Sequence, residues 1–370
     1  MIDKKIIFFP QNYNQHINFV ELADNLVDRG FTNTESIKFL KIQGAFYDDK
    51  SDLIIGYEEI KINWVANKSI YRMGLLERLC NIVKNVNCLR CLSFLDDNIL
   101  VVGNDGAIQR YLNNYFHLFK FYIICDTIIF PQKKIYIVYK IVFDLASKLK
   151  LSHFFPGLSF HTQNSGIFVC NENSMSLLKD RGVSSPIYVA EMPVHRKNAK
   201  EFELLKSSRT SNGNNVLYIT SAYVWHRKLE EDIYQRLDIE DLISHFGNDT
   251  SWKVKIRIHP REELANYAWI EKKCSNISIS HSIPLVEDLL WCDKLITAMS
   301  SVGYESRELG INTYIYRKNF GQLPKSSIYN NGFNIINSLK DLSIDKQSKD
   351  YTVSLSEREE IADRLISDCG

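Results

Sequence analysis

Residues 252–310 read WKVKIRIHPREELANYAWIEKKCSNISISHSIPLVEDLLWCDKLITAMSSVGYESRELG, and this stretch decides the fold class. Apolar and polar side chains alternate over residues 253–258, as in a β-strand with one buried face. Further strand patterns lie at 277–280 and 294–297, and helix patterns lie at 263–273, 286–290 and 304–309. Strands that alternate with helices build an open parallel sheet, which binds ligands beyond the carboxyl ends of its strands.

The same alternation extends outward over the rest of the chain. Strand patterns lie at residues 6–10, 98–102, 121–130, 167–170, 187–194 and 215–219, and helix patterns at 16–30, 69–84, 107–116, 134–149, 173–181, 227–246 and 356–367. Residues 195–214 are polar, basic and rich in Ser, Asn and Gly, a composition typical of a linker. We therefore expect an α/β protein with two Rossmann-like, doubly wound parallel-sheet domains that face a cleft, over residues 1–199 and 200–370.

Length and composition indicate a globular protein with room for two cores. The chain has 370 residues, of which 45% are hydrophobic and 24% charged. Its formal net charge of +1 argues against a nucleic-acid partner. The first apolar run is too short for a signal peptide, and no run reaches the ~18 residues of a membrane span. The eight cysteines are scattered, mostly in apolar strand patterns, so we expect reduced core thiols in a cytoplasmic protein.

Several common ligand motifs are absent from the sequence. The first strand pattern leads into Pro10-Gln11-Asn12 without a GxGxxG, and no GxxxxGK[ST] occurs, which disfavours a nicotinamide dehydrogenase and a P-loop NTPase. Cys88 and Cys91 form a lone CxxC with no second pair at zinc-ribbon spacing. No metal-binding DxD of the kind that holds a nucleotide diphosphate is evident. We therefore expect no metal.

A histidine stands where the strand pattern at 253–258 ends. Pro260 ends the strand and favours an extended conformation for His259, so this side chain is expected at the strand's carboxyl end. A lone histidine there would most simply cap the strand. Arg257 and Arg261 on either side, together with the loop setting, favour an anion site instead, with phosphate as the first candidate.

Two hydroxyls stand at the next helix start. Ser300 and Ser301 follow the strand pattern at 294–297, and serine there either caps the helix or binds a phosphate with the same geometry. Glu305, in the first turn of that helix, either binds a ribose hydroxyl or interacts with the positive end of the helix dipole.

One carboxylate of the first half has a similar position. Asp105 follows the apolar strand pattern at 98–102, between Gly103 and Gly106. Asn-Asp-Gly is turn chemistry in any protein, but a strand end is also where a general base would face a ligand. The competing pair Asp96-Asp97 precedes the strand, so it is expected at the opposite edge of the sheet.

Three of these segments together resemble the motifs of bacterial sialyltransferases. Asn104-Asp105-Gly106 resembles their D/E-D/E-G motif, residues 257–262 (RIHPRE) resemble their HP motif, and Ser300-Ser301 resembles their serine pair. The resemblance covers about residues 98–310, in the family's order. It departs from the family at Asn104, where the motif has a carboxylate.

The resemblance implies a GT-B glycosyltransferase that moves sialic acid from a CMP-activated donor to a glycan hydroxyl, with inversion and without a metal or cofactor. In this reading His259 stabilises the leaving phosphate and Asp105 is the general base. The donor would be bound by Arg257, Pro260, Arg261, Thr220, Ser221, Ser282, Ser300, Ser301 and Glu305. The acceptor, a glycan or glycolipid, would be bound by Asn104, Gly106 and His16.

Other functions stay open at this point. Within the same class, the donor could be CMP-Kdo, or the transferred group a polyol phosphate from a CDP donor. A UDP-sugar 2-epimerase with a similar two-domain sheet and a non-catalytic glycan-binding protein are the alternatives from other classes. Peripheral association with the inner membrane and the oligomeric state are open as well.

Overall fold

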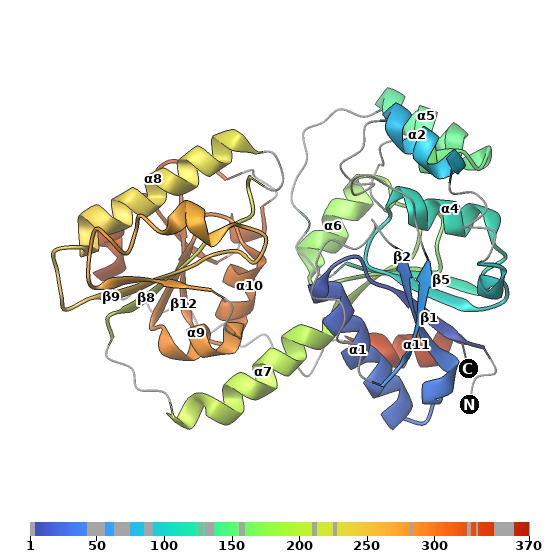
Figure 1. Ribbon diagram of the computed structural model, residues 1–370, viewed down its shortest axis with the longest axis horizontal. Helices are drawn as coiled ribbons and strands as arrows, with labels where there is room; N and C mark the ends of the chain where they lie inside the picture. The colour runs from blue at the N-terminus through green and yellow to red at the C-terminus, as the bar shows by residue number, and fades with distance from the viewer. Residues whose placement is uncertain are drawn as a thin grey trace. The chain divides into compact units, whose positions relative to one another are not determined.

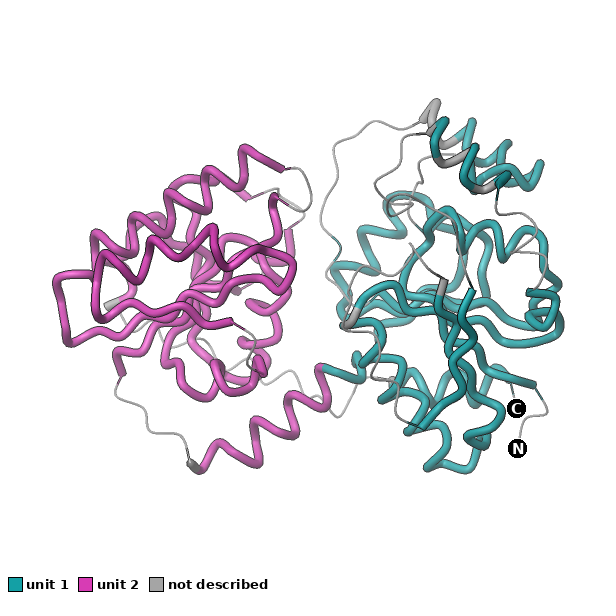
Figure 2. The backbone as a smooth tube through the Cα atoms, viewed as in Figure 1, with its two compact units in different colours: residues 1–194, 355–370 teal, residues 195–354 magenta. Residues whose placement is uncertain are grey.

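The chain divides into two units, one of residues 1–194 with 355–370 and one of residues 195–354 (Figure 2). The computed structural model describes residues 4–42, 56–62, 75–84, 92–125, 129, 137–154, 160–208, 213–224, 228–281, 284–323, 327–330, 332–343 and 359–369. Each unit is built around one parallel sheet.

Unit 1 contains an eight-stranded sheet of order β14-β7-β6-β5-β4-β1-β2-β3. Its strands are β1 (Ile6–Phe9), β2 (Ile37–Ile42), β3 (Glu58–Ile62), β4 (Ile99–Val102), β5 (Lys120–Cys125), β6 (Gly166–Val169), β7 (Ile187–Glu191) and β14 (Glu359–Glu360). All of its described pairings are parallel. β1 and β4 are buried along their whole length, as strands covered by helices on both faces must be.

The helices of unit 1 are α1 (Tyr13–Asp28), α2 (Leu75–Lys84), α4 (Ala107–Tyr115), α5 (Ile137–Lys148), α6 (Glu172–Asp180) and α11 (Ile361–Cys369). Ile7 of β1 belongs to a core that also holds Ile108 of α4 and Leu178 of α6. The next residue, Phe8, points to the other face, where its ring lies 5.3 Å from that of Phe19 in α1. Strand alternation thus divides the helices between the two faces of the sheet (Figure 1).

Unit 2 contains a six-stranded sheet of order β10-β9-β8-β11-β12-β13. Its strands are β8 (Asn215–Ile219), β9 (Lys253–Arg257), β10 (Ile277–Ser280), β11 (Lys294–Thr297), β12 (Asn312–Tyr316) and β13 (Asn334–Ile336), and its helices are α8 (Leu229–Phe246), α9 (Leu285–Trp291) and α10 (Ser301–Glu308). Val216 and Tyr218 of β8 join the core beneath α8, whereas Leu217 and Ile219 join the core beneath α9. The expected doubly wound α/β architecture is therefore confirmed.

The expected linker at 195–214 is wrong over most of its length. Residues 193–205 form helix α7 (Pro193–Leu205), and Pro193 occupies the first helical position, where its missing N–H costs nothing. The helix buries only Ala199 and Phe202, so its sequence is polar nearly all round and looks like a linker. The units divide at residues 194 and 195, five residues before the expected boundary.

The end of the chain was expected in the second domain, but residues 355–370 belong to unit 1. Arg29, just after α1, forms ion pairs with Glu360 and Asp363. Arg364 donates to the Tyr188 hydroxyl at 2.9 Å, and Tyr122 donates to Asp368 at 3.2 Å. These partners lie far away in sequence, so no local pattern indicated this return.

Three further elements differ from the sequence-based expectation. The expected helix at 263–273 is only a short 3-10 turn, Leu264–Tyr267. The strands β13 and β14 were not predicted, because they are only three and two residues long. Among the described helices, none combines the length and apolar character needed to cross a bilayer.

Candidate functional site

The sheet of unit 2 has its topological switch point between β8 and β11. From β8 the chain moves outward through β9 and β10, and from β11 it moves the other way through β12 and β13. Open α/β sheets bind ligands at this point, beyond the carboxyl ends of the two strands. Thr220 and Ser221 follow β8 there, and residues 298–301 follow β11. Four of the expected donor-binding residues therefore lie at the switch point in the structure: Thr220, Ser221, Ser300 and Ser301.

Thr220 connects the end of β8 to the end of β9. Its side chain is fully buried. Its hydroxyl accepts a hydrogen bond from the backbone N–H of His259 at 2.8 Å and donates to the carbonyl oxygen of Arg257 at 3.2 Å. A buried hydroxyl with both bonds made holds a fixed geometry. Thr220 thus positions the backbone of His259 beside the switch point.

His259 lies at the carboxyl edge of the sheet, as the sequence predicted, two residues after β9 ends. Its ring nitrogen Nδ1 accepts a hydrogen bond from the backbone N–H of Arg261 at 3.2 Å. With Nδ1 as an acceptor, the neutral ring carries its proton on Nε2. This tautomer follows from the hydrogen-bond partner. The imidazole can therefore donate through Nε2 to an anion.

The turn between β11 and α10 is held by side chains from three other segments. Ser221 Oγ donates to the carbonyl oxygen of Met299 at 2.8 Å, and the Tyr329 hydroxyl donates to that of Ser300. Arg317, which directly follows β12, donates from Nη1 to the carbonyl oxygen of Ala298 at 3.3 Å. Every carbonyl from 298 to 300 thus has a partner, and we call residues 298–301 the serine turn.

Ser300 is the N-cap of α10, because its Oγ accepts from the backbone N–H of Val302 at 3.4 Å. Ser301 begins the helix and is partly exposed. A Cβ added at Gly303 would lie 2.9 Å from Thr297 Cγ2, so only glycine lets the first turn pack this closely on β11. The serine turn therefore joins hydroxyls to the positive end of a helix dipole, an arrangement that favours anions.

Two of the expected donor-binding residues are paired with other protein groups. Arg257 Nη1 lies 2.7 Å from Oδ2 of Asp288, a fully buried carboxylate that also accepts from Ser280 and lies 3.4 Å from Lys255 Nζ. Glu305 Oε1 lies 3.0 Å from His195 Nε2 in α7. Arg257 thus neutralises a buried charge, and Glu305 pairs with His195. Pro260 is exposed and Arg261 partly buried, whereas Ser282 lies outside the described residues.

Sequence reasoning missed several residues that support this edge. Arg317 also donates to the carbonyl oxygens of Phe320 and Gly321, so it shapes the loop after β12. Gln235 of α8 accepts from the backbone N–H of Ser221 at 2.6 Å. An arginine directly after a strand was a visible signal for the first, but nothing local marks a mid-helix glutamine.

Asp238 of α8 lies fully buried near this loop. Burial raises its pKa to about 7, against the opposing effect of hydrogen bonds from Asn319 and Tyr218. The Asn319 amide donates to Asp238 at 2.8 Å, and the Tyr218 hydroxyl donates at 3.2 Å. The loop after β12 is therefore attached to a carboxyl group that titrates near neutral pH.

The sheet of unit 1 has an equivalent switch point between β1 and β4. The Asn104 amide, after β4, donates to Gln11 Oε1, after β1. A Cβ at Gly103 would lie 2.0 Å from the amide carbon of the Gln15 side chain, so this side chain packs directly against the backbone of Gly103. Gln11 Nε2 and Asn104 Oδ1 are buried and have no hydrogen-bond partner among the described residues. Buried polar atoms left unpaired at a switch point are a place for a polar ligand.

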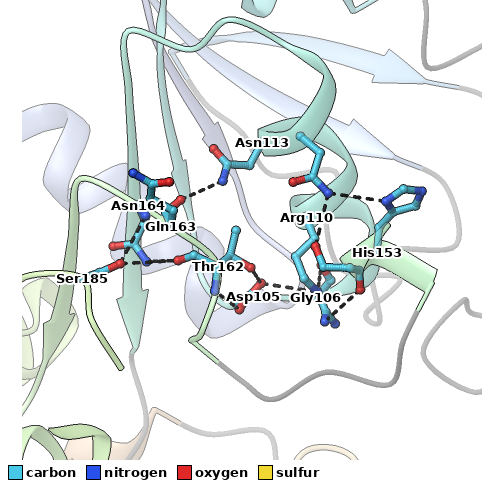
Figure 3. A network of polar contacts seen from close by, with 11 residues as sticks. Asp105, Gly106, Arg110, Asn113, His153, Thr162, Gln163, Asn164 and Ser185 are labelled. Carbon is cyan, nitrogen blue, oxygen red and sulfur yellow. Dashed lines mark hydrogen bonds and ion pairs between the residues drawn. The ribbon is translucent and has the colours of Figure 1, made fainter. Parts of the chain in front are cut away.

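Asp105 lies at this carboxyl edge, but its side chain is buried instead of facing a cleft (Figure 3). Its two oxygens accept from Thr162, at 2.6 Å from Oγ1 and 3.2 Å from the backbone N–H. Arg110 Nε lies 3.5 Å away, and this buried guanidinium also donates to the carbonyl oxygens of Gly106 and Ser152. The expected orientation is therefore corrected, because the carboxylate anchors residue 162 to the start of α4.

The other expected acceptor residues lie near the same edge. Gly106 is the N-cap of α4, with no side chain to cap it. His16, in the first turn of α1, is buried, with its ring 5.5 Å from that of Phe39. Burial lowers the pKa of His16, although Glu59 opposes the shift. His16 is therefore a neutral imidazole at physiological pH. Asp96, the competing acid, accepts from the His117 N–H before β4 begins, at the amino edge.

Among the described residues, no group of three His, Cys, Asp or Glu side chains is placed to hold a metal ion. Cys88 and Cys91, which form the lone CxxC, lie outside the described residues.

No family model and no curated protein matches the sequence. Solved structures do match the fold along nearly the whole chain. One is the wall teichoic acid polymerase TagF, in a variant soaked with CDPG, at 14% identity with 98% of this chain and 87% of that chain covered and a TM-score of 0.54. This chain has the GT-B fold.

UDP-GlcNAc 2-epimerases share the GT-B fold with this chain. The epimerase from Methanocaldococcus jannaschii is 12% identical, covers 98% of this chain and 99% of its own, and has a TM-score of 0.54. A putative UDP-N-acetylglucosamine 2-epimerase from Listeria monocytogenes is 12% identical, with 98% and 95% covered and a TM-score of 0.59. At such identities the similarity establishes the GT-B fold alone.

Proposed function

We propose that this chain is a glycosyltransferase that moves sialic acid, or a related nonulosonate, from a CMP-activated donor to a hydroxyl of a glycan acceptor, with inversion and without a metal, in the assembly of a surface glycan. One observation carries the proposal. In unit 2, His259, with its Nε2 donor, and the serine turn lie at the same switch point. Hydrogen bonds connect Thr220 to His259 and the neighbouring Ser221 to the serine turn.

The donor chemistry fits these groups. A CMP-sugar leaves as a phosphate monoester, so the charge that develops is that of one phosphate. The imidazole N–H of His259, the hydroxyls of Ser300 and Ser301 and the amino end of α10 can stabilise that charge without a divalent cation. The His259 ring and the Ser300 hydroxyl are already oriented by hydrogen bonds, so these two donors need little reorganisation when the glycosidic bond to the phosphate breaks.

The acceptor is proposed to bind at the switch point of unit 1, where Gln11 and Asn104 offer unpaired buried polar atoms and His16 is a neutral imidazole. The resemblance implies that Asp105 is the general base. Thr162 and Arg110 occupy its carboxylate, so that role requires these contacts to open. The anchoring role of Asp105 requires no rearrangement.

A second candidate is transfer of a polyol phosphate from a CDP-activated donor. The fold similarity to TagF, in a variant soaked with CDPG, favours this second candidate. His259 and the serine turn would then bind whichever phosphate of the CDP donor lies closest to them. The epimerases favour a third candidate, chemistry on a UDP-sugar. All three use a nucleotide-activated substrate at the carboxyl edge of unit 2.

A donor panel tests the proposal. The purified protein is incubated with CMP-Neu5Ac, CMP-Kdo, CDP-glycerol and UDP-GlcNAc, each with and without a galactoside or lipid-linked acceptor, in EDTA. Acceptor-dependent release of CMP from CMP-Neu5Ac is expected. If only CDP-glycerol were turned over, the second candidate would be supported in place of the first. If only UDP-GlcNAc were turned over, the third candidate would be supported. Activity that vanishes in EDTA and returns with magnesium would contradict the metal-independent mechanism.

A further inference from the structure

Helix α5 of unit 1 exposes an apolar face. Four of its side chains, counting the residue that follows the helix, are between 41% and 62% exposed: Ile141, Val142, Leu145 and Leu149. Three of them recur at a spacing of four residues, so they lie on one side of the helix. Phe143 and Ala146 are buried and attach α5 to the unit. The four exposed side chains therefore leave about half of their surface in contact with solvent.

Helix α2 adds to this surface. Both α2 and α5 contact the 3-10 turn η4 (Ser152–Phe154), and they lie together at one end of unit 1 (Figure 1). Leu76 and Val83 of α2 are 75% and 65% exposed. We call these six side chains the α2–α5 face. Several large apolar side chains exposed on two helices at the same end of a unit indicate an interaction surface.

The charge around the α2–α5 face is positive. From residue 137 to 151 the sequence has three lysines, Lys140, Lys148 and Lys150, against the single acid Asp144. The chain as a whole has a formal charge of only +1. Lys148, Lys150 and Lys84 at the end of α2 are exposed, as are the acids Asp144 of α5 and Glu77 of α2, which leaves the described exposed charges of these segments with an excess of one lysine. Exposed apolar side chains and exposed lysines therefore occur together on α2 and α5 and directly after α5.

Exposed apolar side chains together with lysines favour a lipid surface as the binding partner. An interfacial helix inserts its aliphatic side chains below the headgroups, and flanking lysines extend their ammonium groups to anionic lipids. A protein partner that buried this face would also have to desolvate these lysines. We propose that the α2–α5 face docks unit 1 on an anionic bilayer. The docking goes beyond the proposed transferase activity and does not depend on the identity of the donor.

Vesicle co-sedimentation tests the docking. The full-length protein is mixed with vesicles of phosphatidylethanolamine and phosphatidylglycerol (3:1) or of phosphatidylcholine alone. We expect binding to the first and little to the second, weakened by salt. Leu145→Glu with Leu149→Glu should lower the affinity by roughly 100-fold or more, because charges replace two leucines that insert into the bilayer in the docked state. Lys84→Gln with Lys148→Gln should lower it on the order of 10-fold or more.

Matched controls distinguish binding through the α2–α5 face from non-specific binding to vesicles. Leu204→Glu with Leu229→Glu changes two leucines of α7 and α8 that are 79% and 65% exposed, and should leave vesicle binding unchanged. Lys179→Gln with Lys200→Gln is the matched charge control, since both lysines are exposed elsewhere. Equal binding by wild type and the α5 leucine variant would overturn the proposal. So would a wild-type dimer in solution that the same variant dissociates, without any preference for anionic vesicles.

Discussion

The hydroxyl of Thr220, at the end of β8, accepts a hydrogen bond from the backbone N–H of His259, at the end of β9, over 2.8 Å. This bond connects the two strand ends that border the candidate phosphate site. Thr220→Val keeps the shape of the side chain but leaves that buried N–H unpaired. The change should cost about 1–3 kcal/mol of folding free energy and lower turnover by displacing the histidine.

Thr297→Val is the matched control for this position. Thr297 is equally buried, and its hydroxyl donates to the carbonyl oxygen of Ile219 at 3.2 Å without touching His259. Chemical denaturation and steady-state kinetics give the two quantities. Comparable losses of turnover per unit of lost stability in both variants would show that Thr220 has no specific positioning role.

His259→Ala tests the group that is proposed to donate to the leaving phosphate. Turnover should fall by a factor on the order of 10²–10⁴, because a positioned proton donor is lost. Stability should change little, since the side chain is only partly buried at a strand end. The measurements are initial rates at saturating donor and thermal unfolding. An unfolded His259→Ala protein would mean that the residue is structural.

Asp105→Asn distinguishes the anchoring role from the catalytic one. Removing one partner of the buried Asp105–Arg110 pair should destabilise the fold by about 3–5 kcal/mol. Arg110→Met in the same chain should recover part of this loss, because no unpaired charge then remains. If Asp105→Asn abolished transfer at unchanged stability, the general-base role would be supported and the anchoring role rejected.

Asp238 predicts a pH dependence of stability. Its pKa is 3.8 in an ordinary carboxyl group and about 7 in the fold, because it is buried. Between these values the folded state holds a proton that the unfolded chain has released, so stability falls as pH rises through this window. The full effect is on the order of 4 kcal/mol and is complete above pH 7.

Asp238→Asn should remove this dependence. Urea denaturation of wild type and variant at pH 5 and pH 8 measures it, and the variant should gain stability relative to wild type at pH 8. Asp249→Asn, at a fully exposed position, is the control. The same difference between wild type and Asp238→Asn at both pH values would contradict the assignment.

Most of the fold was predictable from the sequence because many of its strands are short runs of strand-forming residues with clear ends. The strands at 215–219, 277–280 and 294–297 have the expected bounds in the structure. Helix α7 was not predictable, because it buries only two apolar side chains and is polar elsewhere. The return of α11 to unit 1 depends on contacts such as Arg29 with Asp363, which are 334 residues apart.

The same distinction holds for the candidate site. Strand ends are visible in a sequence, so the positions of His259 and Ser300 at the carboxyl edge could be predicted. Side-chain pairing is not visible. Asp288 binds Arg257 across 31 residues, and Thr162 binds Asp105 across 57 residues. Arg257 and Asp105 carry the expected charges at the expected strand ends, yet each is paired with another protein group.

Calorimetric titration of CMP into the purified protein tests the central claim most directly. The wild type should bind CMP in EDTA, and His259→Ala should bind it roughly 10- to 100-fold more weakly, as expected for a lost hydrogen bond to a charged group. His245→Ala is the control, since this exposed histidine ends α8 at the opposite, amino edge of the sheet. Absence of CMP binding by the wild type, or equal affinity in His259→Ala, would contradict a nucleotide-phosphate site at the switch point of unit 2.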